Sequence, residues 1–474
     1  YPEYFGKVIN AVDFTKVDIK LNGSSVDLAK DEFSDFELAL DMKKGILNRS
    51  FIVAKDGQKF RLNFERFVSV AQKELYASKI TVENLSDTEA SVEIRSYIDA
   101  DVFNEDANYD EKFWNVLAQN VAETHMSLTA QTIPNNFGTP QFTTEMLADH
   151  VTDLRPMAAE TTEKSVINTF AGQIAAGQTV TFEKRVIVVT SRDHETQEAL
   201  TQAAQTLSQK QAESSFEELK AAQAAGWAKR WEKADVEISG NAESQQGIRF
   251  NLFQLFSTYY GDDARLNIGP KGFTGEKYGG ATYWDTEAFA VPLYLALADE
   301  SVTKNLLKYR YDQLAGAYHN AQQQGLKGAL YPMVTFNGIE CHNEWEITFE
   351  EIHRNGTIAY AIYNYTRYTG DEEYATHDGF DVLVGIARFW ADRVHYSKRK
   401  GQYMIHGVTG PNEYENNVNN NWYTNMLAKW CLNYANEIAD KVSAQKLAQL
   451  DLSETERQKW HEVADNMYLP QDQE

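Results

Sequence analysis

Cysteine is scarce in this sequence, which has only Cys341 and Cys431 among its 474 residues. Two thiols provide no disulfide framework, so we expect a reducing compartment and predict a cytoplasmic protein. No apolar run reaches the roughly 18 residues that a membrane-spanning helix needs, and no secretory leader is visible. Because the chain starts at Tyr1 rather than at methionine and ends at Glu474 without a closing element, we interpret it as a fragment lacking both termini.

Positively charged residues are also few, because the sequence has 45 Lys and Arg residues against 69 Asp and Glu residues, which gives a net charge of -24. Such a surface repels nucleic-acid phosphates and anionic lipid, so we predict neither a nucleic-acid nor a membrane partner. The sequence contains no G-x-S-x-G elbow, no P-loop and no G-x-G-x-x-G fingerprint, which argues against several enzyme classes.

Aromatic residues, in contrast, are plentiful at 12% of the chain. They fit large hydrophobic cores, and they equally fit platforms on which the apolar face of a sugar ring stacks. The length is sufficient for two or three domains, each with its own core.

Residues 1–193 read as strands and predict a β-sandwich domain, truncated at its N-terminus. Phe36, Leu38 and Leu40 alternate with polar residues, as in a half-buried strand. Asp56-Gly57 lies between two apolar runs and predicts a hairpin. A second hairpin is predicted between residues 82–87 and 90–94. Many antiparallel strands without intervening helical periods are typical of a sandwich.

Residues 194–245 are rich in strong helix formers and predict a helical linker, although a disordered polar linker is the alternative. Residues 246–474 carry apolar residues at helical spacing and predict the catalytic domain. Long connections at 261–285, 325–355 and 399–420 interrupt these helices, and loops of that length are usually functional. The pattern favours an α/α toroid with its chemistry on loops at one end.

The first of three loop clusters is Tyr278–Glu287, where aromatic residues and carboxylates stand just before a helix. Asp285 could simply cap that helix, with Trp284 packed beneath it. Alternatively, the ring stacks on a sugar and the carboxylate accepts hydrogen bonds from two adjacent hydroxyls.

The second cluster, residues 340–355, holds five carboxylates, two histidines and a tryptophan. His342 and His353 lie eleven residues apart, and the cluster has no H-x-x-x-H or C-x-x-C spacing, so we predict no metal. The acids could form a solvated face. The interleaved Trp345, Ile347 and Phe349 instead favour partial burial, where hydroxyl recognition is effective.

The third cluster is His406–Trp422, in which Gly410-Pro411 forces a turn just before Glu413. Breaking a glycosidic bond needs an acid that a poorly solvated setting keeps protonated, and Glu413 is our candidate for that acid. The run of asparagines at 416–421 could be loop and cap chemistry only.

These clusters resemble glycoside hydrolase family 65, and the similarity runs over essentially the whole chain. The matching runs are Asn267–Glu276, Tyr283–Glu287, Gly328–Pro332, His342–Ile347 and His406–Tyr414. The resemblance implies a multidomain β + α protein with an N-terminal antiparallel β-sandwich, a helical linker and an (α/α)6 six-hairpin toroid barrel, here incomplete at its C-terminus.

The resemblance also implies inverting phosphorolysis, in which maltose and phosphate give β-D-glucose 1-phosphate and D-glucose. It places Glu413 on the general acid and Trp284, Asp285, Trp345 and Glu346 in the glucose subsite. His342, Asn343 and Glu344 fall on the loop that selects the acceptor sugar. No cofactor is implied, because phosphate is a substrate, and a homodimer is expected.

Two departures from the family pattern stand out. Asn412 occupies a position that is usually aspartate, and the change removes a negative charge that would favour protonated Glu413. The family's Lys-Gln pair, and the later loop that holds phosphate, would come after residue 474, so we predict no phosphate-binding residue in this chain.

An inverting phosphorylase needs one protein carboxylate, because anionic phosphate replaces the water and base of an inverting hydrolase. The alternatives are an inverting α-glucosidase or trehalase, a kojibiose or trehalose phosphorylase, and a sugar-binding protein without catalysis.

Overall fold

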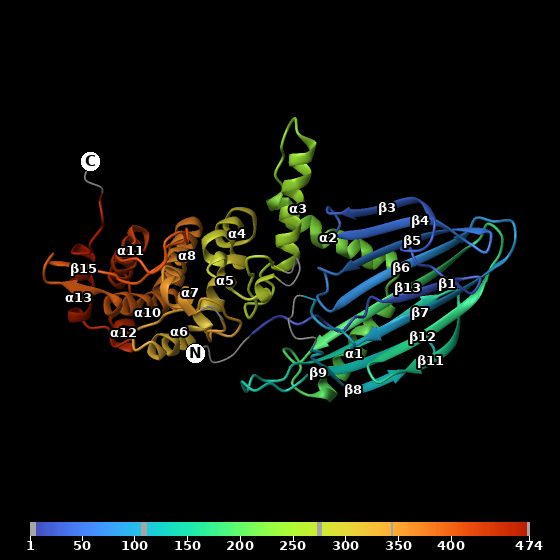
Figure 1. The fold of residues 1–474 in the computed structure, drawn as a ribbon, viewed down its shortest axis with the longest axis horizontal. Coiled ribbons are helices and arrows are strands. Elements are labelled where there is room, and N and C mark those ends of the chain that lie inside the picture. The colour runs from blue at the N-terminus through green and yellow to red at the C-terminus, as the bar shows by residue number, and fades with distance from the viewer. Residues whose placement is uncertain (1–5, 106–110, 273–276, 343–344, 472–474) are drawn as a thin grey trace. The chain divides into compact units, whose positions relative to one another are not determined.

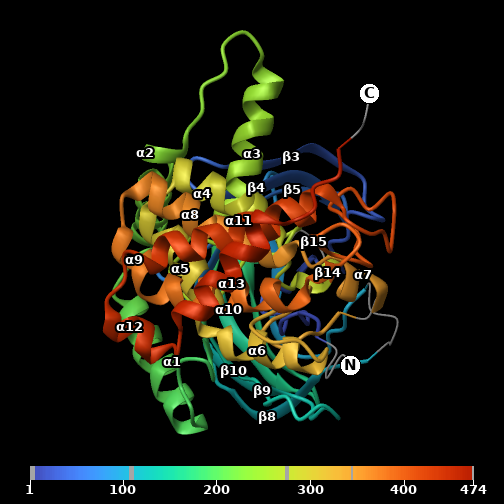
Figure 2. The ribbon, with the colours of Figure 1, turned by 90° about the vertical axis from the view of Figure 1, so that its left-hand side faces the viewer.

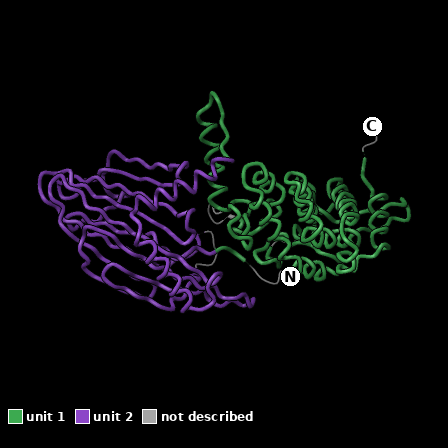
Figure 3. The backbone as a smooth tube through the Cα atoms, turned by 180° about the vertical axis from the view of Figure 1, so that it is seen from behind, with its two compact units in different colours: residues 1–8, 234–474 green, residues 9–233 purple. Residues whose placement is uncertain are grey.

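The computed structural model describes residues 6–105, 111–272, 277–342 and 345–471. The backbone divides into two compact units, one of residues 9–233 and one of residues 1–8 with 234–474 (Figure 3). The division falls inside the segment predicted as a linker. In the described residues, no helix combines the length and apolar character needed to cross a membrane.

Two antiparallel sheets form the first unit (Figure 1). The smaller sheet has the order β11 (Arg155–Thr161), β12 (Ser165–Ile174), β7 (Ala90–Asp99), β1 (Val17–Leu21) and β2 (Ser24–Ser25). The larger has the order β3 (Phe33–Asp41), β4 (Ile46–Lys55), β5 (Gln58–Val68), β6 (Leu75–Asn84), β13 (Thr179–Thr190), β10 (Thr143–Thr152), β9 (His125–Thr132) and β8 (Trp114–Val121). Buried residues of both sheets, such as Ile94 and Phe170 from one and Phe60 and Phe182 from the other, share one core, so the predicted sandwich is confirmed.

The predicted hairpin at Asp56-Gly57 is confirmed, and the second predicted hairpin is wrong. β4 and β5 pair up to Lys55 and Gln58, and the two turn residues have φ of 51° and 78°. β6 and β7, however, pair with different neighbours, β6 with β5 and β13, and β7 with β1 and β12. The connection therefore crosses from one sheet to the other, and both strands bury alternate residues in the shared core.

Edge strand β3 also differs from its prediction. Phe36 and Leu38 were expected on a half-buried face, but their side chains are 47% and 58% exposed. Alternation alone indicates that one face is apolar, and at a sheet edge that face has fewer neighbours to cover it.

The polar segment after the sandwich is helical, as predicted, and consists of α1 (Gln197–Ala212) and α2 (Phe216–Ala234). Leu200, Ala204 and Phe216 are buried against Leu75 and Ile187 of the larger sheet. Neighbouring Val186 points into the core between the sheets, so Ile187 and these helices lie on the opposite face. The helices thus pack on the sandwich rather than only connecting it.

The second unit is mainly helical. Its elements are α3 (Ala242–Thr258), η1 (Lys277–Gly280), η2 (Thr286–Ala290), α4 (Val291–Leu297), α5 (Glu300–Asp312), α6 (Leu314–Gln323), α7 (Trp345–Glu350), α8 (Arg354–Thr369), α9 (Glu372–Thr376), α10 (Asp378–Arg393), β14 (His395–Ser397), β15 (Gln402–Met404), α11 (Trp422–Ala439), α12 (Ala444–Gln449) and α13 (Glu454–Asp465). Helices α4, α8 and α11 contact one another in sequence, and so do α5, α10 and α13 (Figure 2). The two rows are also in contact, which is the packing of an α/α barrel.

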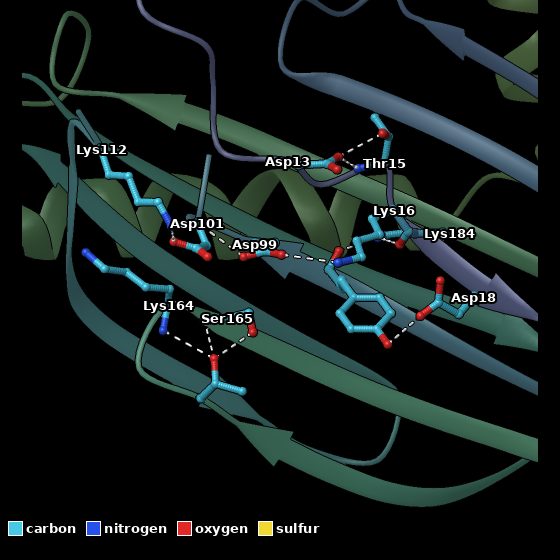
Figure 4. Close-up of polar contacts among 12 residues, drawn as sticks. Asp13, Thr15, Lys16, Asp18, Asp99, Asp101, Lys112, Lys164, Ser165 and Lys184 are labelled. Carbon is cyan, nitrogen blue, oxygen red and sulfur yellow. Dashed lines mark hydrogen bonds and ion pairs between the residues drawn. The ribbon is translucent and has the colours of Figure 1, made fainter. Parts of the chain in front are cut away.

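Lys184, a residue of β13, is completely buried in the sandwich. Its Nζ atom donates hydrogen bonds to the carbonyls of Tyr97, at 2.6 Å, and Lys16, at 3.5 Å. Figure 4 shows Lys184 beside Lys16, which pairs with Asp99 at 3.4 Å. Burial lowers the pKa of Lys184 from 10.5 to about 7, although Asp13 opposes the shift. The fold therefore disfavours the ammonium form of this side chain.

We expect Lys184→Met to stabilise the protein at pH 7 by about 2–4 kcal/mol, because each pKa unit corresponds to about 1.4 kcal/mol. Between the folded pKa of about 7 and the unfolded value of 10.5, the unfolded chain binds more protons. Wild-type stability therefore rises with pH across this window, and the variant should lack that slope. Denaturant unfolding at several pH values measures both effects. Exposed Lys16→Met is the control, and an unchanged slope in Lys184→Met would contradict the prediction.

Candidate functional site

Three segments that are distant in the sequence meet at the start of helices in one row. Trp284 and Asp285 come directly before η2, which leads into α4. His353 precedes α8, and the loop containing Glu413 leads into α11. Because α8 contacts both α4 and α11, these helix starts carry the polar residues of the three predicted clusters to one region of the helical unit.

Aromatic contacts join the three helix starts. The imidazole of His353 lies 4.8 Å from the Trp284 ring and 5.9 Å from the Tyr423 ring, measured between ring centroids, both edge to face. His353 is completely buried, and its pKa falls to about 4 because of burial and the positive charge of Arg354. The ring is therefore neutral near pH 7 and links Trp284 to the first turn of α11.

A buried ion pair between Glu287 and Arg310 fixes the segment that contains Asp285. Glu287 accepts from Arg310 Nε at 2.7 Å and from Arg310 Nη2 at 3.0 Å, and the two side chains are 1% and 2% exposed. Arg310 also donates to the carbonyl of Tyr283 at 3.2 Å. The segment on either side of Asp285 is thus fixed to α5.

The carboxyl of Asp285 makes no capping hydrogen bond, so the helix-cap explanation does not account for it. The Thr286 hydroxyl instead donates to the Ile268 carbonyl at 2.5 Å. Burial, and then the negative charges of Glu287 and Glu413, raise the pKa of Asp285. A half-buried carboxyl without a capping role is suited to bind sugar hydroxyls.

Glu413 lies on a tight turn, as Gly410-Pro411 predicts. Its backbone N–H donates to the Gly410 carbonyl at 3.1 Å, and its φ is 55°, a value that residues other than glycine rarely adopt. The sequence predicted a poorly solvated side chain, but Glu413 is exposed among the described residues. The turn places Glu413 near Glu351 and Asp285 but leaves it accessible to solvent, so the local sequence alone does not bury it.

Glu351 is the carboxyl that sequence reasoning missed. It is 1% exposed, and among the described residues its Oε1 atom has no hydrogen-bond partner. Burial, the charge of Glu413 and the charge of Asp285 raise its pKa to about 8, against the opposing effect of Arg354. The surroundings of Glu351 therefore favour its protonated form. Nothing local distinguishes it from the other four carboxylates of residues 340–355, because only tertiary packing buries it.

Comparison with known proteins identifies the family of both parts of the chain. Residues 249–474 match the model of the glycosyl hydrolase family 65 central catalytic domain, and residues 1–230 match the N-terminal domain of the same family. The chain belongs to glycosyl hydrolase family 65.

Two named relatives of this chain are phosphorylases. The chain is 54% identical over 471 residues to the maltose phosphorylase of Bacillus subtilis, covering 99% of this chain and 61% of that protein. It is 32% identical to the α,α-trehalose phosphorylase of Thermoanaerobacter brockii, covering 100% of this chain and 64% of that protein. The chain thus spans about three fifths of the length of these relatives.

A solved structure of a putative kojibiose phosphorylase from the human microbiome has the same fold. It superposes with a TM-score of 0.90 at 26% identity and covers 98% of this chain and 62% of that chain. The match extends over both units, which supports the sandwich and the α/α barrel packing described above.

Of the remaining predicted residues of this family 65 chain, His342 and Glu346 are described by the structure. The Nδ1 atom of His342 lies 3.0 Å from the Thr348 hydroxyl, and the His342 ring meets the Tyr283 ring edge to face at 6.3 Å. Glu346 is exposed in the first turn of α7. Asn343 and Glu344 lie outside the described residues, and so does the side chain of Trp345. Of the three residues predicted to select the acceptor sugar, His342 is therefore the one whose contacts the structure describes.

Cation and thiol chemistry have little support in this region. Within the described ranges, no group of three or more His, Cys, Asp or Glu side chains is arranged to hold a metal ion. Cys341 and Cys431 are both buried, and neither forms a disulfide. The chemistry available at the helix starts is that of carboxyl groups and aromatic rings.

Proposed function

We propose that this chain carries the sugar site and the general acid of an inverting disaccharide phosphorylase that acts on maltose. The observation that carries the proposal is the meeting of Asp285, Glu351 and Glu413 at the helix starts, in a chain 54% identical to a maltose phosphorylase. In this reaction maltose and phosphate give β-D-glucose 1-phosphate and D-glucose, without a cofactor.

Glu413 and Asp285 have distinct parts in the proposed reaction. Glu413 donates its proton to the glycosidic oxygen, which leaves with the bonding electron pair as a hydroxyl of the released glucose. A phosphate oxygen attacks the anomeric carbon from the opposite face, which inverts its configuration. Asp285 accepts hydrogen bonds from the hydroxyls of the transferred glucose, and Trp284 stacks on its ring.

Hydrolysis on the same scaffold would need a carboxylate base that activates water. Glu351 is the second carboxyl beside Glu413, and burial and the charges of Glu413 and Asp285 raise its pKa. Phosphate is the nucleophile in the proposed reaction, so comparing turnover with and without phosphate distinguishes this reaction from hydrolysis.

The choice of disaccharide is the finer part of the proposal. Relatives are named for maltose, trehalose and kojibiose. We therefore propose incubating the full-length protein with each of the three sugars, with and without phosphate, and identifying the products. Maltose cleavage that requires phosphate and yields β-D-glucose 1-phosphate supports the proposal, whereas phosphate-independent release of two glucose molecules supports a hydrolase. Light scattering on the same sample tests the homodimer that we also propose.

We expect Asp285→Asn to raise the KM for maltose by about 10- to 100-fold, because a hydrogen bond to a charged group contributes about 1.5–3 kcal/mol. Affinity should also fall in the wild type as the pH drops through the raised pKa of Asp285, since the neutral acid is a weaker acceptor. Initial rates across maltose concentrations measure the change. Asp465→Asn, at an exposed residue of α13, is the control. A KM unchanged in Asp285→Asn would remove Asp285 from the glucose subsite.

A further inference from the structure

The carboxylate of Glu350 joins the two sides of the loop that carries Glu413. Its Oε2 atom accepts a hydrogen bond from the Thr409 hydroxyl at 2.5 Å and another from the Asn417 backbone N–H at 2.8 Å. The Glu350 carbonyl also accepts from the Thr409 N–H at 3.2 Å. Thr409 and Asn417 lie four residues before and four residues after Glu413. One residue at the end of α7 therefore holds both sides of the turn.

Apart from Glu350, few contacts among the described residues fix the shape of this loop, although the Asn417 backbone N–H also lies 3.4 Å from the Thr409 hydroxyl. Residues 412–417 are exposed, so burial contributes little to their position. Glu413 and Asn417 have φ of 55° and 53°, and such conformations persist only where the surroundings impose them. Two backbone hydrogen bonds between Val408 and Val418, of 2.9 and 2.8 Å, close the base of the loop. Above that base, Glu350 is the buried group to which both sides are anchored.

A simpler explanation is that Glu350 is a buried carboxylate whose oxygens need hydrogen-bond donors, whichever residues supply them. Glu340 fits that description, because it accepts from the backbone N–H groups of Met333, Val334 and His342, all within seven residues. The side-chain partners of Glu350, in contrast, are 59 and 67 residues away, and both belong to the Glu413 loop. A buried carboxylate can obtain its hydrogen bonds from nearby residues, as Glu340 does, so that need alone does not require partners in the Glu413 loop.

We propose that Glu350 is the positioning residue of the general acid, acting on Glu413 through Thr409 and Asn417 without touching the sugar. This inference rests on the proposed function. Proton donation depends steeply on placement, since a displacement of about 1 Å can lower a rate by about 100-fold. Glu350 is 9% exposed and Thr409 is 1% exposed, so the bond between them is largely shielded from competing water.

The test compares two substrates in the full-length protein with phosphate present. Maltose needs a proton on its departing oxygen, whereas α-D-glucosyl fluoride releases fluoride with the bonding electron pair and needs none. We expect Glu350→Ala to lower kcat on maltose by about 10- to 100-fold, to change KM less than threefold, and to leave phosphorolysis of the fluoride within about threefold of wild type.

Two further variants separate positioning from damage to the fold. In Glu350→Gln the amide oxygen can still accept both hydrogen bonds, so we expect kcat on maltose within about fivefold of wild type. Thr409→Val removes one anchor with little change of shape and should show a milder version of the Glu350→Ala pattern. This variant decides the question if Glu350→Ala does not fold. Glu373→Ala, at an exposed carboxylate of α9, is the control and should leave both rates unchanged.

Two results would overturn the positioning role and leave the proposed function intact. One is an equal loss of activity on both substrates in folded Glu350→Ala. The other is full activity on maltose in both Glu350→Ala and Thr409→Val. A wild-type protein that turns over no disaccharide with phosphate would instead overturn the proposed function itself.

Discussion

Glu413→Gln is expected to lower the rate of maltose phosphorolysis by about 10³-fold or more while maltose still binds. General acid catalysis typically contributes 10²- to 10⁴-fold, and glutamine keeps the shape of glutamate but has no acidic proton to donate. Formation of β-D-glucose 1-phosphate measures the rate, and calorimetric titration with maltose measures binding. The loss should be confined to kcat, because the interaction is made with the departing oxygen.

α-D-Glucosyl fluoride supplies the internal control for this variant. Its cleavage needs no acid, so Glu413→Gln should retain much of its activity on the fluoride. Wild-type phosphorolysis of maltose in Glu413→Gln would show that another group supplies the proton. A wild-type protein without turnover, whose Glu413→Gln variant also loses sugar binding, would instead indicate a sugar-binding protein.

Arg310→Met is expected to destabilise the helical unit by about 3–5 kcal/mol, because it leaves the carboxylate of Glu287 buried without its partner. Both side chains are almost completely buried, and two hydrogen bonds of 2.7 and 3.0 Å join them. The pair also fixes the segment that contains Asp285. We therefore expect a higher KM for maltose in protein that remains folded, along with the lower stability measured by denaturant unfolding.

A double variant distinguishes the effect of an unpaired buried charge from the effect of lost packing. Combining Glu287→Leu with Arg310→Met removes both charges, so it should recover much of the stability that Arg310→Met alone loses. The exposed pair of Lys308 and Asp312 is the control, because Lys308→Met should cost less than about 0.5 kcal/mol. A double variant as unstable as Arg310→Met would point to lost packing rather than to an unpaired charge.

The sandwich was predictable where local chemistry decides the structure. Asp56-Gly57 adopts the positive φ values of a tight turn, so β4 and β5 pair as predicted. The connection between β6 and β7 has a similar pattern, yet these strands belong to different sheets. A short polar connection is compatible with either outcome, and the choice depends on which partners complete each sheet.

The site was predictable in its members but not in its assembly. Trp284, Asp285 and Glu413 stood out because aromatic rings and carboxylates flank helix starts and a forced turn. Glu351 and Glu350 did not stand out from their acidic neighbours. Their roles depend on burial and on hydrogen bonds that span about 60 residues, as for Glu350 and Thr409, and no local pattern records these.

By itself, the sequence determined the order of β and α segments, the turn at Gly410-Pro411 and the similarity to one family, because backbone preferences and matching motifs are local properties. The tertiary structure decided that Asp285, Glu351 and Glu413 meet, and that Glu351 is a buried acid whereas Glu413 is exposed. The physical reason is that packing of α4, α8 and α11 brings their starts together. There, burial and the charges of neighbouring carboxyls raise the pKa of Asp285 and of Glu351.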